Sequence, residues 1–328
     1  MTGFPDPAAR TPDEVALLTG IVADLRNDLP KLIYADWLDD RGDDRGEFLR
    51  LFVHAYHTGK EPPEPSACTP GPWLALTGCE LLAGLRRYDL THLTAPLLRL
   101  ARPVIVMTAQ LVDDQPLSVG ASRFGGDPDL AIDAGWPTDA NGPLPFLAQF
   151  NLADFAGIPA AAELPPVGLL SVFYDGDGWG GGDRGWRLVH TPPGHPLAQQ
   201  ATPAEAAREY LSTTPMCRLV FAEGLDIPDR DSPWAAELDL KEDGYGPRNE
   251  GYHELLGPDD RHQLLGYPRL IQGDVLRSAD ARHLLSLGSD NVPGWCWGDW
   301  GTLYYTLPAA KLAAGRLADD VRFEMQCS

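Results

Sequence analysis

From Pro103 to the C-terminus the sequence alternates short apolar runs with Gly, Pro and Asp, and this texture constrains the fold more than any other feature. The runs are VIVMTAQL, PFLAQFNL, VGLLSVFYD, WRLVHT, CRLVFAE, HLLSL, GTLYYTL and VRFEMQ. They are rich in Val, Phe and Tyr and are bounded by turn residues, which favours strands of an antiparallel or mixed sheet. One helix should interrupt them after Thr202, and a last helix should run from Pro308 to Ala314. We therefore predict a β-rich, mainly antiparallel domain over residues 103–328.

The N-terminal residues show helical periodicity instead. Thr11 can cap a helix whose first turn contains Pro12, and Glu14 would complete a capping box. The helix should end near Asn27 and bury the apolar residues Val15, Leu18, Val22 and Leu25.

Two further helices should follow in the same segment. The second is expected from about Pro30 to a stop at Gly42, and the third is expected after Asp44, with Glu47 as its reciprocal cap. The inward face of the third helix would consist of Phe48, Leu51, Phe52 and Ala55. These three helices predict a compact helical unit over residues 11–58.

Residues 59–102 connect the two regions. Gly, Pro, Glu and Ser dominate from Thr58 to about Pro72, a composition typical of a linker. The leucine-rich stretch that follows, up to Arg102, indicates short helices. The sequence thus predicts an α+β protein in three segments, residues 11–58, 59–102 and 103–328.

The charge balance restricts the classes of partner. The chain has 47 Asp and Glu residues against 26 Lys and Arg, a formal net charge of -21, and no basic run reverses the sign locally. Such a surface repels phosphate backbones and anionic lipid, so we expect neither a nucleic-acid nor a membrane partner and favour a basic protein or a cation. No apolar stretch approaches the roughly 18 residues of a membrane span, and no signal peptide is visible, which predicts a cytoplasmic protein.

The number and spacing of the cysteines are also typical of a cytoplasmic protein. There are five, at positions 68, 79, 217, 296 and 327, and none forms a CxxC pair. An odd number of scattered cysteines argues against a disulfide framework and against a zinc site. We expect reduced thiols.

The helical segment carries two specific motifs, Tyr34-Ala35-Asp36-Trp37-Leu38 and Arg45-Gly46-Glu47-Phe48. With them it resembles the short repeat-companion domain found beside other modules in large bacterial genomes. The resemblance implies an accessory or docking segment and no catalysis. The five aspartates at positions 36, 39, 40, 43 and 44 are interpreted as a solvated helix face and turn rather than a metal cluster, because runs of charge usually lie in water.

Four segments of the C-terminal region carry a second resemblance. They are Phe124-Gly125-Gly126-Asp127-Pro128 with Trp136-Pro137, Phe146-Leu147-Ala148-Gln149 with Asn151-Leu152, Leu264-Leu265-Gly266-Tyr267-Pro268 with Gln272, and Trp297-Gly298-Asp299-Trp300-Gly301. Through these segments the chain resembles the bacterial YwqG-like family, a domain of unknown function. The resemblance implies a β-rich fold, and an immunity or antitoxin-like role enters only by analogy with relatives.

A weak internal repetition accompanies this pattern. Gly126-Asp127-Pro128 precedes PFLAQF and then GLLSVFYD, while Gly266-Tyr267-Pro268 precedes HLLSL and then GTLYYTL. Two related β units would explain the recurring order, and coincidence among Gly-Pro turns would explain it equally.

Two clusters are candidates for a binding surface. The Gly-rich loop with Asp175, Asp177 and Asp183 offers oxygen ligands for a hard cation, but its spacing departs from an EF-hand, and a hairpin turn is the favoured interpretation. The second cluster, with Gln272 nearby, consists of Asp290, Trp295, Trp297, Asp299 and Trp300. Carboxylates beside aromatic rings can hold a cationic side chain or a sugar, although tryptophans near a Gly-rich turn are more often core residues.

No catalytic residue and no cofactor are predicted. The sequence lacks GxSxG, HExxH, GxxxxGKS and a GxGxxG after a strand, and neither His54 with His57 nor His253 with His262 has a third metal ligand. We expect a binding module for another protein, with an immunity-like inhibitor as the concrete form. An enzyme or ligand-binding domain with an acidic and aromatic pocket is the alternative, and a tether in which residues 1–60 alone carry the association is a third possibility.

Overall fold

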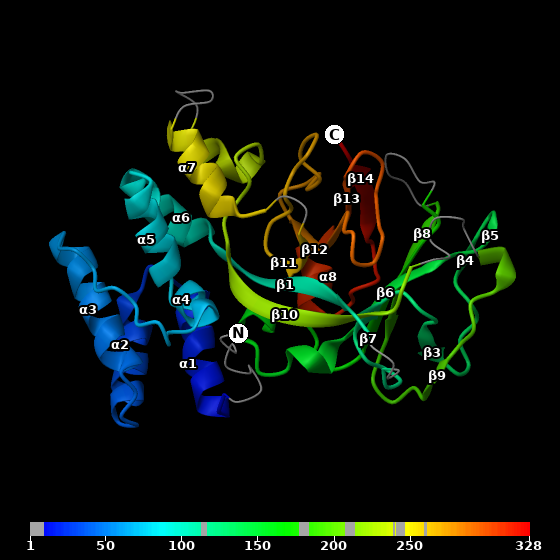
Figure 1. Cartoon of the computed structure of the whole chain (residues 1–328), viewed down its shortest axis with the longest axis horizontal. Coiled ribbons are helices and arrows are strands. Elements are labelled where there is room, and N and C mark those ends of the chain that lie inside the picture. The colour runs from blue at the N-terminus through cyan, green and yellow to red at the C-terminus, as the bar shows by residue number, and fades with distance from the viewer. Residues whose placement is uncertain are drawn as a thin grey trace. The chain divides into compact units, whose positions relative to one another are not determined.

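The computed structural model describes residues 10–112, 117–176, 184–206, 214–238, 240, 247–258 and 261–328 (Figure 1). The chain divides into two compact units. The first, called the helical unit below, comprises Met1–Ile105, Gly157–Ala162 and Ala222–Gly257, and the second, the sheet unit, comprises Val106–Ala156, Glu163–Phe221 and Pro258–Ser328. The three-segment division made from the sequence remains a prediction.

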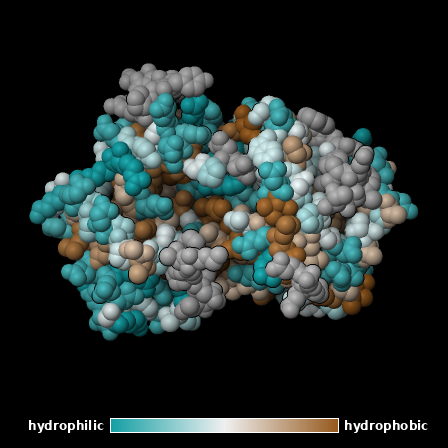
Figure 2. All heavy atoms as spheres, in the orientation of Figure 1, coloured by the Kyte–Doolittle hydropathy of each residue, from teal (hydrophilic) through white to brown (hydrophobic). Residues whose placement is uncertain are grey.

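The three expected N-terminal helices are present. They are α1 (Pro12–Ala23), α2 (Asp28–Asp39) and α3 (Arg45–Thr58). Thr11 caps α1 by accepting a hydrogen bond from the Glu14 amide, and Gly59 ends α3 in the left-handed conformation, at φ 68°. Hydrophilic residues cover most of these helices on the face shown in Figure 2.

Three details of the helical prediction are wrong. The Glu14 carboxylate does not return to the cap but accepts a hydrogen bond from the hydroxyl of Tyr34 at 2.7 Å. Asp44 makes no capping hydrogen bond, because the neighbouring Asp43 accepts from the first amide of α3 instead. Leu51 is 48% exposed, and the buried face of α3 includes Leu49, Phe52, Val53 and Ala55. The buried face of α3 is thus rotated relative to the predicted one.

The core of the helical unit is organised around Tyr34. Its hydroxyl donates to Glu14 and accepts from the indole N–H of Trp73 at 3.0 Å, and all three side chains are buried. Burial and the neighbouring carboxylate raise the pKa of Tyr34 well above its ordinary value, so the hydroxyl keeps its proton. One hydroxyl thereby links α1 and α2 to the helix that contains Trp73, α4 (Gly71–Leu76).

The leucine-rich stretch forms short helices, as predicted. They are α4 (Gly71–Leu76), α5 (Cys79–Arg87), the 3-10 helix η2 (Thr91–Leu93) and α6 (Thr94–Leu100). The unit is completed by η4 (Pro159–Ala161), η6 (Pro233–Glu237) and α7 (Pro247–Leu256). Within the described ranges, no helix is both long and apolar enough to cross a bilayer.

Helix α7 was not predicted. Gly251 lies in its middle and lowers the helix propensity of the segment. A Cβ atom at Gly251 would lie 2.6 Å from the Cβ atom of Tyr88, so the glycine is required by the close approach of α7 to Tyr88.

The predicted sheet is confirmed. Among the described residues ten strands form one sheet in the order β14-β13-β12-β11-β1-β10-β2-β6-β7-β8. In chain order these strands are β1 (Arg102–Leu111), β2 (Arg123–Phe124), β6 (Phe146–Asn151), β7 (Leu169–Tyr174), β8 (Trp186–Thr191), β10 (Cys217–Asp226), β11 (His262–Leu265), β12 (Ala281–Gly288), β13 (Thr302–Pro308) and β14 (Arg322–Gln326). Strands β1 and β10 each cross the division between the two units.

Short elements complete the sheet unit. Strands β3 (Asp129–Ala131) and β9 (Leu197–Gln199) pair with each other, as do β4 (Thr138–Asp139) and β5 (Gly142–Pro143). The remaining helices are η3 (Leu152–Phe155), η5 (Ala204–Ala206) and α8 (Ala309–Ala313). Most of the helix expected after Thr202 falls outside the described residues.

The sheet order places one antiparallel meander, β2-β6-β7-β8, on one side of β1 and β10 and another, β11-β12-β13-β14, on the other. Gln149 lies opposite Ser171 in the first meander, and Gln263 lies opposite Ser286 in the second. The equivalent strands are therefore β6 with β11 and β7 with β12. The repetition in the sequence matches PFLAQF, which contains most of β6, with HLLSL, which belongs to β12. In the structure the counterpart of β6 is β11, so the match in the sequence is displaced by one strand.

A buried ion pair fixes the start of the first meander. The guanidinium of Arg123 donates to the Asp129 carboxylate at 2.6 Å, and both side chains are 1% exposed. The same carboxylate accepts from the amide of Gly120 and from the side chain of Gln149, each at 2.7 Å. Burial opposes ionisation, but these hydrogen bonds outweigh it and lower the pKa of Asp129.

Replacing Asp129 tests this network. Asp129→Ala leaves the Arg123 guanidinium buried without its anion, which costs about 3–5 kcal/mol for a broken buried pair. Urea unfolding should show this loss, whereas Asp133→Ala at an exposed position near β3 should leave the free energy of unfolding nearly unchanged. Equal stability of the two variants would contradict a structural role for the ion pair.

Candidate functional site

The acidic and aromatic cluster predicted from the sequence lies in one loop between β12 and β13, residues 290–301, called the tryptophan loop below. Asp290 and Trp295 exchange two backbone hydrogen bonds of 2.9 Å each, which closes the first half of the loop. The Asp290 carboxylate also accepts from the amide of Val292 at 2.8 Å. The loop is thus a hydrogen-bonded structure rather than an open connection.

Two tryptophans anchor the loop in the core. Trp295 is 2% exposed, stacks at a tilt against Phe124 with ring centroids 4.6 Å apart, and donates its indole N–H to Thr214. Trp297 is 3% exposed and donates its indole N–H to the carbonyl of Gly288 at 3.2 Å. Trp297 is therefore enclosed in the core with its indole N–H paired, rather than exposed on the loop.

Asp290 accepts a hydrogen bond from His262. The His262 Nδ1 atom accepts the amide N–H of Gly288 at 3.1 Å, so the ring proton lies on Nε2, which donates to Asp290 at 3.0 Å. This hydrogen bond outweighs partial burial and lowers the pKa of Asp290. With both ring nitrogens engaged, His262 has no lone pair left with which to accept a substrate proton.

Cys217 also experiences the charge of Asp290. Burial and the negative charge of that carboxylate raise the pKa of the Cys217 thiol to about 11. The thiol therefore stays protonated at neutral pH, and a protonated thiol is a poor nucleophile. Histidine, cysteine and carboxylate are near one another here without the features of a nucleophilic centre.

The outer part of the loop is exposed. Asp299 is exposed, and the side chain of Trp300 is 42% exposed. Trp300 has a φ of 56°, in the left-handed region that costs a bulky residue of order 1–3 kcal/mol. The next residue, Gly301, is closely packed, because a Cβ atom there would lie 2.1 Å from the backbone carbonyl oxygen of Gln326. Trp300 therefore combines an exposed side chain with a strained backbone next to a closely packed glycine.

The other predicted site residues are dispersed. Asp175 is 7% exposed, and its amide donates to the carbonyl of Gly185 at 2.8 Å, which continues the antiparallel pairing of β7 with β8. Asp177 and Asp183 lie outside the described residues. Gln272 is exposed, and only its backbone amide is engaged, by the side chain of Gln326. No group of three or more His, Cys, Asp or Glu in the described part of the chain could hold a metal ion.

Sequence reasoning missed the partner of Asp290. The sequence shows no third metal ligand for His262, and in the structure this histidine instead holds the loop carboxylate of Asp290. The signal was present, since a histidine inside the apolar strand HQLL must find partners for both ring nitrogens.

The fold and the loop define an α+β protein with a two-meander antiparallel sheet and a tryptophan-anchored loop beside it. Residues 122–327 match the family model DUF1963, a domain of unknown function. The match spans more than half of the chain, and the protein belongs to this family. No curated protein matches the chain.

The His262–Asp290 pair predicts a pH dependence. The pKa of Asp290 is lower in the folded protein than the roughly 3.9 of an unfolded aspartate, so the pair stabilises the fold above about pH 4, and this contribution is lost as the pH falls through the folded pKa. Asp290→Asn should reduce the free energy of unfolding by about 1–3 kcal/mol at pH 7, and the difference from the wild type should shrink at pH 3.

Urea unfolding at the two pH values measures this effect, with Asp299→Asn as the matched control in the same loop. Because Asp299 is exposed, that variant should match the wild type at both pH values. A difference between wild type and Asp290→Asn that grows in acid would contradict the assignment.

Proposed function

We propose that this protein is a binding module that recognises another protein through the exposed part of the tryptophan loop. The observation that carries the proposal is Trp300, an exposed indole held in a left-handed conformation directly after the exposed carboxylate of Asp299. Strain of this kind persists only where surrounding contacts enforce it, and it concentrates at functional sites.

The chemistry of the surface suggests the kind of partner. Tryptophan is among the residues that contribute most to protein interfaces, because it offers a large, rigid contact area. Asp299 beside it favours a Lys or Arg side chain, which can pair with the carboxylate and lie over the indole face. The net charge of -21 would in addition attract a basic partner over a longer range.

The rigidity of the loop supports recognition. The Asp290–Trp295 bridge, the two buried indoles and the hydrogen bond from the Gly301 amide to the Trp297 carbonyl at 2.7 Å hold the loop before any partner binds. A surface that is already ordered loses little conformational entropy on association.

An enzymatic role receives less support from the same residues. The ring nitrogens of His262 are both engaged and the Cys217 thiol has a raised pKa, while Trp297 is enclosed instead of lining a cleft. We therefore prefer binding to catalysis. A cytoplasmic, immunity-like inhibitor related to the YwqG-like proteins, with α1 to α3 as a repeat-companion docking segment, is the specific form of the proposal.

Substitutions in the exposed part of the loop test the proposal. The tagged full-length protein would capture partners from an extract of its native cells, and each captured protein would be purified and titrated. Trp300→Ala should weaken binding about 30-fold or more, the effect of removing an interface hot spot of about 2 kcal/mol. Asp299→Asn should weaken binding at low salt and have little effect at high salt, because salt screens an exposed charge.

The matched control is Val292→Ala, which removes another exposed apolar side chain from the same loop. It should leave the affinity within about threefold of the wild type. Binding that is unchanged in Trp300→Ala would refute the proposed surface, even if a partner is found.

A further inference from the structure

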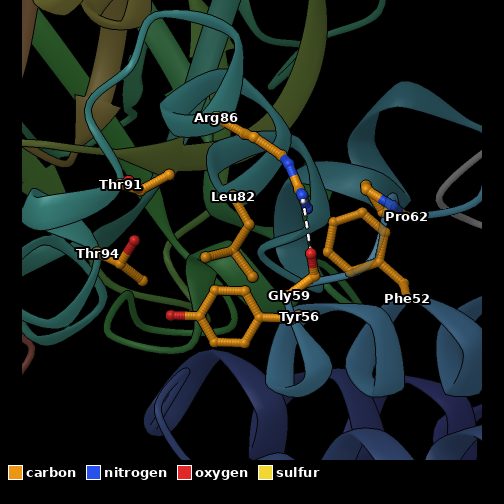
Figure 3. A pocket seen from close by; sticks show the side chains of 8 residues that line it. All are labelled: Phe52, Tyr56, Gly59, Pro62, Leu82, Arg86, Thr91 and Thr94. Carbon is orange, nitrogen blue, oxygen red and sulfur yellow. Dashed lines mark hydrogen bonds between the residues drawn. The ribbon is translucent and has the colours of Figure 1, made fainter.

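The helical unit contains a pocket unrelated to the tryptophan loop. It has a volume of about 290 Å³ and is lined by Phe52, Tyr56, Gly59, Pro62, Leu82, Arg86, Thr91 and Thr94 (Figure 3). For comparison, an apolar protein cavity of about 150 Å³ accommodates benzene, and ligand pockets begin at about 300 Å³. The space therefore suits a ligand of one or two rings.

The walls of the pocket are apolar on two sides. Phe52 and Tyr56 are one turn apart on α3 and present their rings to the same space, and Leu82 projects from α5 toward them (Figure 3). Pro62 extends the apolar lining. Rings of this kind favour an aromatic ligand, since offset and edge contacts between aromatic groups add to the burial of apolar area.

Arg86 supplies a positive charge at the rim. Its guanidinium donates to the carbonyl of Lys60 at 2.7 Å and to the carbonyl of Gly59 at 3.4 Å, and the second contact is drawn in Figure 3. These two hydrogen bonds orient the guanidinium of Arg86 and leave its other N–H donors available for a ligand. The nearest acid, Glu61, is 85% exposed and 3.8 Å away, a pairing too exposed and too long to compete strongly with a bound anion.

Hydroxyl groups complete the polar part of the lining. Thr94 is buried and Thr91 is exposed, and both lie at the start of the helices that border the pocket, η2 and α6. A partly apolar pocket with a fixed guanidinium and the hydroxyl groups of two threonines combines the features that bind and orient an amphiphilic anion.

We propose that this pocket binds a small aromatic carboxylate, with the ring between Phe52, Tyr56 and Leu82 and the carboxylate on Arg86. The same chemistry occurs in a free aromatic acid and in an aromatic residue at the C-terminus of a polypeptide. An open pocket accommodates either the free acid or the C-terminal residue, and the experiment below distinguishes these two ligands.

The test titrates the full-length protein with indole-3-acetate and with indole-3-acetamide, its uncharged analogue, by calorimetry. The acetate should bind at least about tenfold more tightly, the difference expected for a charge-assisted hydrogen bond to a guanidinium. Gly-Gly-Trp with a free or an amidated C-terminus forms the second arm. Tighter binding of the free acid than of Gly-Gly-Trp identifies a small-molecule site, and the reverse order identifies a C-terminal residue as the ligand.

Variants locate the binding. Arg86→Gln should weaken acetate binding about tenfold or more, while Arg87→Gln, an exposed neighbour outside the lining, should not change it. Glu61→Gln should change acetate binding by less than about twofold, because this exposed acid competes only weakly for Arg86. Leu82→Trp fills the pocket without touching the hydrogen bonds of Arg86, and it should abolish binding even if Arg86→Gln disturbs folding.

Three results would overturn the proposal. They are the absence of binding by both carboxylates, equal binding of the acetate and the acetamide, and binding that survives in Leu82→Trp. None of these results bears on the tryptophan loop, since the two sites share no residue.

Discussion

Buried glutamine side chains hold the irregular segments of the sheet unit to its strands. Gln149 accepts from the amide of Asp129 and donates to the carbonyl of Ala121, and Gln263 donates to two carbonyls of residues 265–267. Gln326 accepts from two amides and donates to one carbonyl of residues 271–273. Backbone groups in irregular chain must find partners when buried, and a strand glutamine supplies both a donor and an acceptor. Folding of these connections therefore depends on the strands that carry the glutamines.

The same arrangement determines the position of the tryptophan loop. Gln326 lies opposite Thr302, the first residue of β13, while its side chain holds residues 271–273. The backbone carbonyl oxygen of Gln326 fills the space beside Gly301. Only a residue without a Cβ atom fits at that position, where the loop enters β13. Trp297 and Trp295 occupy the core beneath, and Trp300 is the indole that remains outward. The exposed indole is thus a consequence of how the sheet closes on its last strand, and its strain is maintained by the sheet.

The sequence predicts the strands well because apolar runs bounded by Gly, Pro and Asp have few alternatives to a sheet. Side-chain roles depend on partners distant in the chain. Nothing in the sequence distinguishes Trp297, a core residue whose indole N–H donates to the carbonyl of Gly288, from Trp300, which is 42% exposed. Helix α7 was not predicted because Gly251 lowers the helix propensity of the segment. The glycine is required there because α7 approaches Tyr88 closely. A glutamine within an apolar run, as in FLAQF, was the available signal for the backbone-holding network.

The most direct test of recognition by the tryptophan loop is photo-crosslinking at position 300. Trp300→p-benzoylphenylalanine keeps an aromatic group at the exposed position, and Leu111→p-benzoylphenylalanine, at a residue that is 61% exposed in β1, is the control. In an extract of the native cells, irradiation should give one dominant protein adduct from position 300, absent from position 111 and reduced by Asp299→Asn. No adduct from position 300, or the same adducts from both positions, would contradict recognition through this loop.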